Sequence, residues 1–493
     1  MKIFTLFSIF ISVFLFSQET VPPIEWGRVY LPTGVNTIRK VPIPGTDNYV
    51  TPDVSIIDEQ GNIVQSSPVS LGVGSVKPTP DGGFIVVKIV NASIAASIFG
   101  DSFTGFGGYD AALIKLNSSL EIEWAQNYGG SGDDQGYNVE PTSDGGYIFV
   151  GRTNSVDGQL TGIKKFGSDI NYYIVKTDSK GEMQWTKTYG GNKLTPAPYI
   201  SLYQASQVIE SAEGGYLVAG TMASGNSGGS DITNPQGSND IWVLKLDTSG
   251  NLQWQKSLGG SSHDNVRHIR QLADGNYIIC GNTESADGDV SEFLGKRDGW
   301  IVKLNAADRT IIWDRTIGGS DWDNLPGYDN SHNSILDVLP DGNLIVIATV
   351  GVGSKEQLPN YPYGPGINTL ASQAAFLLAK INSETGSIIW QKVYGPSGTP
   401  QKGINNLMSS SPSSVTAKSD GSIIVFGHVN FHFSNGKSTG GADFDPSFTT
   451  FDEQPSDDSL MWTFKLSKSL GLEDIDTATN RFVYYPNPVR DIL

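Results

Sequence analysis

Short runs of alternating apolar and polar residues recur along the chain, separated by turns rich in Gly, Asp and Asn. In runs such as IWVLKL (residues 241–246), both faces are apolar, with Trp242 on one and Val243 on the other. A strand that is apolar on both faces is covered on both faces. The next run, NLQWQKSL (251–258), alternates apolar residues such as Trp254 with glutamines. This alternation predicts a half-exposed strand at the outside of a sheet.

Two kinds of hairpin turn alternate between these runs. The first kind has an acidic residue followed by Gly, as in PTSDGGYIFV and QLADGNYIIC. Asp-Gly between apolar runs is a strong hairpin signal, because Gly supplies the positive φ that the turn needs. The second kind joins an inner run to a half-exposed run, as in YYIVKTDSKGEMQW. The repeating unit is therefore four strands, A to D, and such sheets stacked face to face are the blades of a β-propeller.

The turns give the number of blades. Six acidic-Gly turns begin at Asp81, Asp144, Glu213, Asp274, Asp341 and Asp420. A degenerate seventh unit lies earlier, in residues 40–50 and 54–67. The last unit lacks its D strand. PIEWGRVY (23–30) matches a D strand, so we predict that it completes the last blade and closes the ring. The expected fold is an all-β, seven-bladed β-propeller of four-stranded antiparallel blades, with six blades plus a degenerate one as the alternative.

Composition narrows the class of protein. The 493 residues carry a formal net charge of −18 and include 58 Gly and 1 Cys. The acidic balance argues against a nucleic-acid partner, because few cations are available to neutralise phosphates. A lone Cys280 excludes a disulfide framework, so stability must come from buried surface.

The N-terminus carries features of a secretory signal. Lys2 precedes an apolar stretch over residues 3–16, and Ser17 is a small residue near a plausible cleavage point. The stretch is too short to span a bilayer comfortably, and we therefore predict a signal peptide over residues 1–17. The alternative is a buried first strand. We expect no transmembrane segment, and a mature protein that is exported.

The run YDAALIKLNSSLEIEWAQNYGGSGDDQGYNV (109–139) resembles the bacterial β-propeller repeat of secreted and cell-surface proteins. The resemblance extends over most of residues 26–466. The shared residues are turn glycines, apolar strand positions and the Asp before strand C. The resemblance therefore implies a fold and carries little information on activity.

The C-terminal residues RFVYYPNPVRDIL (481–493) resemble the opening of the sorting domain used by type IX secretion. The matching motif is Tyr485, Pro486, Asn487 and Pro488, and residues 471–480 read as a linker after a propeller over residues 18–470. The resemblance implies the type IX machinery as a partner and a secreted or cell-surface location. The family's domain is longer, so we expect only its truncated start here. A chance Pro-Asn-Pro turn is the alternative.

The connections between strands B and C are the long ones, and all should lie on one face of the ring. They carry aromatic residues, of which we single out Tyr361, Tyr363, Phe431 and Phe433 as candidate ligand contacts. Exposed aromatic rings anchor partners, whereas long loops also need apolar residues for their own packing. Both interpretations remain open.

A calcium site is a second candidate on this face. Asp287, Asp289 and Asp298 fall within SADGDVSEFLGKRD (285–298). Calcium takes six to eight oxygen ligands, and Asp-Gly-Asp in a tight loop can supply some of them. The structural alternative is an Asx-turn followed by an Asp that caps strand C.

Three catalytic interpretations are weaker. Asp133, Asp134, Asp264 and Asp323, in the connections between blades, could supply a carboxylate pair for glycoside chemistry at the central mouth. GNSGG (225–229) lacks the strained strand-to-helix turn of a nucleophilic serine. NSETGSIIWQK (382–392) is similar to the repeat of quinone-cofactor propellers only as any blade corner would be.

These observations predict a surface recognition module that binds glycans or surface proteins through its long-loop face. A carbohydrate-active hydrolase or lyase is one alternative, and a passive adhesin or structural spacer is another. We expect binding rather than catalysis and leave the cofactor open, with calcium as the candidate.

Overall fold

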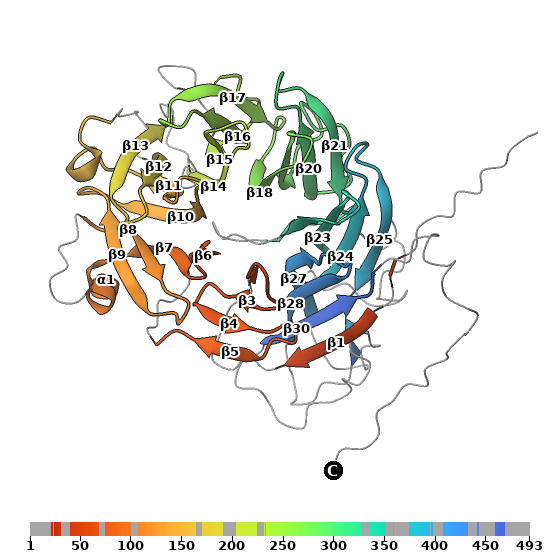
Figure 1. The fold of residues 1–493 in the computed structure, drawn as a ribbon. Helices are drawn as coiled ribbons and strands as arrows, with labels where there is room; N and C mark the ends of the chain where they lie inside the picture. The colour runs from red at the N-terminus through yellow and green to blue at the C-terminus, as the bar shows by residue number, and fades with distance from the viewer. Residues whose placement is uncertain are drawn as a thin grey trace, which may run out of the picture.

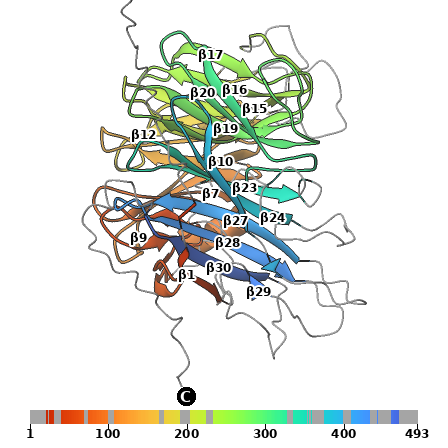
Figure 2. The ribbon, with the colours of Figure 1, turned by 90° about the vertical axis from the view of Figure 1, so that its right-hand side faces the viewer.

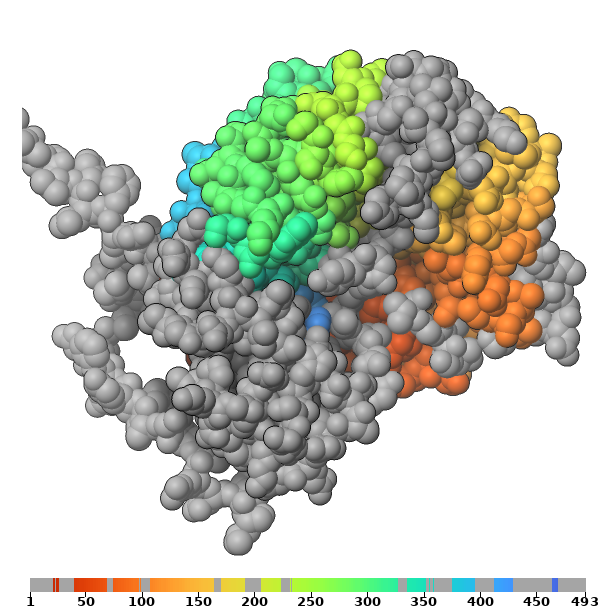
Figure 3. Space-filling model, turned by 180° about the vertical axis from the view of Figure 1, so that it is seen from behind, coloured from red at the N-terminus to blue at the C-terminus, as the bar shows by residue number. Residues whose placement is uncertain are grey.

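The computed structural model describes residues 21–22, 24–30, 40–68, 74–99, 107–163, 170–190, 204–223, 231, 233–326, 335–351, 354, 358, 374–394, 396–397, 408–431, 441–442 and 459–468. Seven antiparallel blades of four strands follow one another around a ring (Figure 1), and one parallel pairing, Ala374 with Ser409, links the last two blades. The first strand of each sheet lies toward the middle and the last lies on the rim. Seen from behind, the described blades follow in chain order around the centre (Figure 3). The prediction of a seven-bladed β-propeller is confirmed.

The first four blades are each formed by four consecutive strands. Their bounds, in chain order, are β2 (Val41–Pro42), β3 (Tyr49–Val50), β4 (Ser55–Ile57), β5 (Ile63–Ser66); β6 (Ser75–Pro78), β7 (Phe84–Val90), β8 (Asp110–Leu116), β9 (Ile122–Tyr128); β10 (Asp134–Pro141), β11 (Tyr147–Thr153), β12 (Asn171–Thr177), β13 (Met183–Tyr189); β14 (Gln204–Glu210), β15 (Tyr216–Ala223), β16 (Asn239–Leu246), β17 (Leu252–Leu258).

The remaining three blades include the one that joins the two ends of the ring. Their strands are β18 (Asp264–Gln271), β19 (Tyr277–Thr283), β20 (Asp298–Leu304), β21 (Ile311–Ile317); β22 (Leu336–Val338), β23 (Leu344–Gly351), β24 (Ala374–Ile381), β25 (Ile388–Tyr394); and β27 (Met408–Ala417), β28 (Ile423–Phe431), β30 (Ser459–Leu466), β1 (Ile24–Tyr30).

Strand β1 closes the ring as predicted. It pairs antiparallel with β30, from Ile24 opposite Leu466 to Tyr30 opposite Met461. The two strands lie side by side in both ribbon views (Figures 1 and 2). The last blade is thus built from both ends of the chain, and β30 has no open edge.

The acidic-Gly turns have the geometry that their sequence predicts. Gly82 has φ of 81° and Gly275 has φ of 85°, a left-handed conformation that Gly adopts without a steric penalty. In the first of these turns, Asp81 Oδ1 accepts a hydrogen bond of 3.0 Å from the Gly83 amide. The acid therefore fixes the turn that its glycine permits.

Inner and outer strands differ in burial as the alternation predicts. Every residue of β16 from Asp240 to Leu246 is buried, including Trp242, whereas β17 is only partly buried. Outer-strand aromatics pack toward the next blade: the rings of Trp254 and Tyr277 lie 6.2 Å apart. The core therefore lies between neighbouring blades, where the faces of adjacent sheets meet.

A buried lysine in strand C joins each of four acidic-Gly turns to its own sheet. Lys176 Nζ, for example, lies 2.8 Å from Asp144 Oδ2, and its side chain is only 2% exposed. Such a lysine needs a partner, because burying an unpaired charge is costly. The four pairs are Lys115–Asp81, Lys176–Asp144, Lys303–Asp274 and Lys380–Asp341.

The structure also departs from the expected pattern. The sequence predicts no helix, yet α1 (Ala92–Phe99) and the 3₁₀ helix η1 (Gly158–Leu160) lie in connections between strands B and C. A small two-stranded sheet, β26 (Pro396–Ser397) with β29 (Gly441–Ala442), lies outside the blades. Within the described part of the chain, no helix has the length and apolar character needed to cross a membrane.

Candidate functional site

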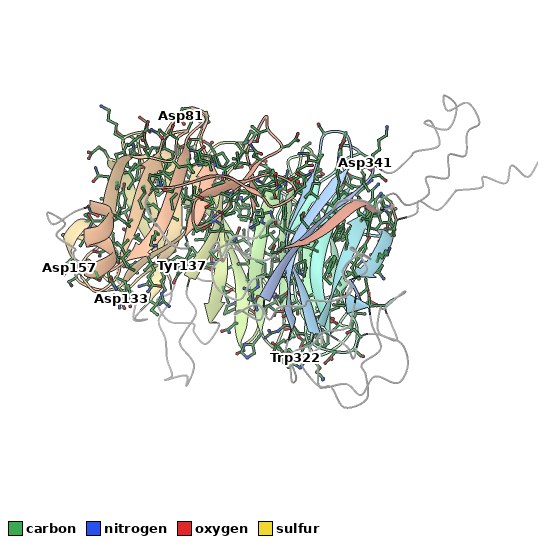
Figure 4. All side chains as sticks on the ribbon, turned by 90° about the horizontal axis from the view of Figure 1, so that it is seen from below. Asp81, Asp133, Tyr137, Asp157, Trp322 and Asp341 are labelled. Carbon is green, nitrogen blue, oxygen red and sulfur yellow. The ribbon has the colours of Figure 1, made fainter. Side chains whose placement is uncertain are left out.

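The two faces of the ring differ as the strand order requires. Asp81 and Asp341, in turns between strands A and B, lie on one face (Figure 4). Asp133, Asp157 and Trp322, in connections between blades or between strands B and C, lie on the opposite face. We call this second surface the loop face. It is the face on which the sequence predicts recognition.

A repeated carboxylate frame underlies the loop face. In one copy, Asp264 Oδ2 accepts hydrogen bonds from the Gly260 amide at 2.9 Å and the Ser285 hydroxyl at 2.8 Å. A second buried acid, Asp240, lies on the other side of Gly259: an ideal Cβ on that glycine would be 2.6 Å from Asp264 Oδ2 and 2.8 Å from Asp240 Oδ1. Two carboxylates thus enclose one glycine. The same arrangement recurs as Asp110–Gly129–Asp134 and Asp298–Gly318–Asp323.

Burial and the charge of a neighbouring acid raise the pKa of acids in this frame. Burial raises the pKa of Asp298 to about 7; the Leu294 amide opposes this shift and the charge of Asp323 adds to it. Burial likewise raises the pKa of Asp240 to about 6, with a contribution from Asp264. A buried acid that accepts few hydrogen bonds near a like charge favours its neutral form. Asp298 is therefore partly protonated near neutral pH.

The candidate calcium ligands do not converge in this structure. Asp287 Oδ1 accepts a 2.7 Å hydrogen bond from the Ser261 amide, and Asp298 Oδ2 accepts one of 2.7 Å from the Leu294 amide. Asp289 Oδ2 accepts one of 2.6 Å from the Gln236 side chain. Among the described residues, no three His, Cys, Asp or Glu side chains are arranged to hold a metal ion. These contacts are those of structural loop aspartates, and calcium binding stays a prediction.

One position on this frame differs from blade to blade. It is the residue just before the frame aspartate of strand A: Asp133, His263 or Trp322. Asp133 Oδ1 accepts a 3.1 Å hydrogen bond from the Tyr109 amide, and His263 Nδ1 lies 3.1 Å from Asn239 Nδ2. We call these three residues the presented residues. A constant backbone frame thus carries an acid, an imidazole and an indole at equivalent places.

Trp322 is the most exposed of the large apolar side chains in the described structure, apart from Val64. Its exposed fraction is 49%. The Arg297 guanidinium lies over its ring at 5.0 Å, and Arg297 Nε donates a 2.8 Å hydrogen bond to Glu284. A cation held over an indole by a carboxylate fixes the ring orientation. Trp322 is therefore a positioned aromatic surface, and no sequence pattern marks it, because it lies in a short connection.

The other predicted site residues are placed less fully. Tyr361, Tyr363 and Phe433 lie outside the described residues, as do the sorting motif Tyr485–Pro488 and the GNSGG segment. Phe431 is the last residue of β28, and its side chain is not among the parts that the structure describes. Their proposed contacts remain predictions.

The acids considered for glycoside chemistry do not form an exposed pair. Asp134, Asp264 and Asp323 are all fully buried in the frame, which leaves only Asp133 partly exposed. Glycoside hydrolysis needs two carboxyl groups that both reach the substrate. These four residues therefore present no such pair in this structure, which agrees with a structural role for aspartates that recur from blade to blade.

A cavity of about 930 Å³ opens in the middle of the ring, lined by the first strands of several blades. A smaller cavity of about 330 Å³ adjoins it on the side of β10 and β14. Both are lined by Lys77 of β6 and by His268 and Arg270 of β18. The larger one reaches the turns between strands A and B, including Gly45 and Pro340, so it opens on the face opposite the loop face. We call the two cavities together the central channel.

Comparisons with known proteins show only partial or distant similarity. No family model matches the chain. The regulatory protein FlaEY of Caulobacter vibrioides is 25% identical over 195 residues, which cover 38% of this chain and 19% of that protein. The chain thus matches less than two thirds of that relative's length.

Among solved structures, quinohemoprotein alcohol dehydrogenase from Comamonas testosteroni has a TM-score of 0.39 at 12% identity, covering 97% of this chain and 79% of that one. A puromycin hydrolase mutant has a TM-score of 0.38 at 10% identity, covering 80% and 59%. At these TM-scores the assignment of the fold rests on the strand order above. The class of protein that the fold defines is the seven-bladed β-propeller.

Proposed function

We propose that this protein is a recognition module that binds its ligand through the loop face. The observation that carries the proposal is the set of presented residues Asp133, His263 and Trp322 on one repeated frame. A scaffold that stays constant while its outward side chains vary is how binding faces are built. The frame acids are buried and hydrogen-bonded, so chemistry by those acids is not part of the proposal.

Glycans are the ligand class that we propose first. The indole of Trp322 is exposed and is oriented by Arg297, and an amphipathic aromatic ring suits the apolar face of a sugar. His263 and Asp133 add hydrogen-bonding groups at equivalent positions of other blades. A surface protein is the other outcome that the test below distinguishes.

Native gels cast with a panel of polysaccharides provide the first test, with calcium or with chelator. We expect selective retardation of the wild-type protein and its loss in Trp322→Ala. Ile312→Ala is the matched control, because Ile312 is also an exposed apolar residue, 42% accessible, but lies on an outer strand. Retardation that both variants retain would overturn the role of the loop face. Absence of retardation on every glycan would leave a protein ligand, and release of sugar products would indicate an enzyme.

We also propose export through a signal peptide over residues 1–17 and sorting by the type IX machinery. Support comes from Lys2 before the apolar segment 3–16 and from the Tyr485–Pro488 motif. N-terminal sequencing of the protein recovered from cells should give a start near Gln18. Deletion of residues 481–493 should abolish surface display if the tail sorts. Protein that retains Met1 would contradict the signal peptide.

A further inference from the structure

Four residues line both cavities of the central channel, and three of them are polar: Lys77, His268 and Arg270, beside Val41. Lys77 comes from the second blade, and His268 and Arg270 come from the fifth. Their side chains therefore converge on the axis from different blades. A convergent set of charged and polar groups in a cavity is the usual form of a small-molecule site.

The acids of the channel wall are already committed to donors of the protein. Asp337 Oδ1 accepts a 2.7 Å hydrogen bond from Arg270, and its Oδ2 accepts one of 2.9 Å from the Ala417 amide. Glu140 forms an ion pair with Lys77. Glu210 accepts two hydrogen bonds from Ser143, at 2.7 Å and 2.8 Å. Each of these carboxylates therefore already has at least one donor of the protein.

Arg270 and His268 have hydrogen-bond donors that no described protein group accepts. Within the described structure, Arg270 donates one hydrogen bond, from Nη1 to Asp337, and its side chain is 40% exposed. A guanidinium has five N–H donors, so most of this one faces the channel without a protein acceptor. Among the described residues, His268 makes no hydrogen bond that would occupy its ring N–H. The wall thus offers free donors at Arg270 and His268.

The charges of Arg270 and Lys77 also act on the imidazole of His268. Burial lowers the pKa of His268 to about 3, and the charges of Arg270 and Lys77 lower it further in the same sense. Both cations therefore lie near enough to the imidazole to disfavour its protonated form. At neutral pH the ring is uncharged and has one N–H to donate.

We propose that the central channel binds a small molecule that carries one carboxylate, held by Arg270, Lys77 and His268. Arginine's planar fork matches a carboxylate through two parallel hydrogen bonds. Each cation already has one acidic partner, so the site favours a single negative charge over a phosphate dianion. The ligand enters from the face that carries the turns between strands A and B, so this site is separate from the loop face and does not depend on the proposed function.

Matched sugar pairs provide the test: glucuronate against glucose and galacturonate against galactose, with inorganic phosphate as a further probe. Calorimetric titration of the full chain should show binding of at least one acid, with no binding of its neutral counterpart. Arg270→Gln should weaken that binding at least tenfold, which corresponds to about 1.4 kcal/mol. Lys296→Met, which removes an exposed lysine outside the channel lining, should leave it unchanged.

A second channel variant separates a loss of binding from a loss of folding. Lys77→Met combined with Glu140→Gln removes a cation and its own partner together, so the charge balance of the wall is kept. It should also weaken binding while its thermal melt remains close to that of the wild type. No binding of either acid at concentrations up to about 10 mM, or binding that both channel variants retain, would overturn the proposal. Tighter binding of phosphate than of either acid would overturn the choice of a carboxylate.

Discussion

Asp240 and Asp264 belong to different blade segments, yet their carboxylates lie on either side of Gly259. An ideal Cβ there would be 2.8 Å from Asp240 Oδ1 and 2.6 Å from Asp264 Oδ2, and Gly259 has φ of 155°. The glycine is therefore required by its neighbours as well as by its backbone. The frame that supports the loop face depends on this contact being free of a side chain.

Gly259→Ala should be strongly destabilising, because its Cβ would push apart two buried carboxylates. We expect a loss of about 3 kcal/mol or more in the free energy of unfolding. Gly145→Ala is the control: Gly145 also has positive φ, 83°, but nothing lies within 4 Å of its Cβ position. It should cost only about 1–2 kcal/mol, from backbone strain. Chemical denaturation of both variants measures the difference, and equal losses would contradict the proposed clash.

Because of Asp298, the free energy of unfolding should fall as the pH rises. Burial raises its pKa in the folded protein to about 7, whereas an unfolded Asp titrates near 3.9. The folded state therefore holds the proton more tightly, so the contribution to stability is complete below pH of about 4 and is lost as the pH rises through about 7. The expected loss over this window is on the order of 2–4 kcal/mol. Denaturation curves at several pH values measure it.

Asp298→Asn isolates this effect, because an amide resembles the protonated carboxyl and does not titrate. Its free energy of unfolding should depend less on pH than that of the wild type between pH 4 and 7. Asp178→Asn removes a charge from a turn between strands C and D and controls for the net charge of the chain. If the three proteins show the same slope, Asp298 does not carry the proton that its burial implies.

The lysine–acid pairs should be more sensitive to loss of the acid than to loss of the lysine. Asp144→Asn would remove the negative charge that is paired with the buried Lys176 ammonium, which also donates to the Thr177 carbonyl at 2.8 Å. We expect a cost of about 3 kcal/mol, because a buried charge loses its partner. Lys176→Met keeps the volume and removes the charge, and should cost about 1 kcal/mol. The reverse order in urea denaturation would show that the ion pair itself stabilises the turn.

The local sequence pattern was sufficient to predict the blades, but it did not show which residues come together in the candidate sites. Asp-Gly turns and the change from two-sided to one-sided alternation are local signals, so the strands, the faces and even the D strand supplied by β1 were predictable. Trp322 and Arg297 meet only because two connections lie side by side, and Lys77 and Arg270 line one cavity only because the ring closes. Such contacts depend on tertiary structure, and nothing in the spacing of these residues marks them.

Ring closure itself gives the last prediction. Removal of residues 18–30 takes away β1, which pairs with β30 from Ile24 to Tyr30. About six backbone hydrogen bonds at about 1 kcal/mol each predict a loss of roughly 5 kcal/mol or more, and the exposed edge of β30 should promote aggregation. Removal of residues 471–493 serves as the control, since these residues lie outside the described blades. Thermal melts with light scattering should separate the two truncations clearly. Equal melting temperatures would mean that the last blade is stable without β1, and that closure by the N-terminal strand is not what holds the ring together.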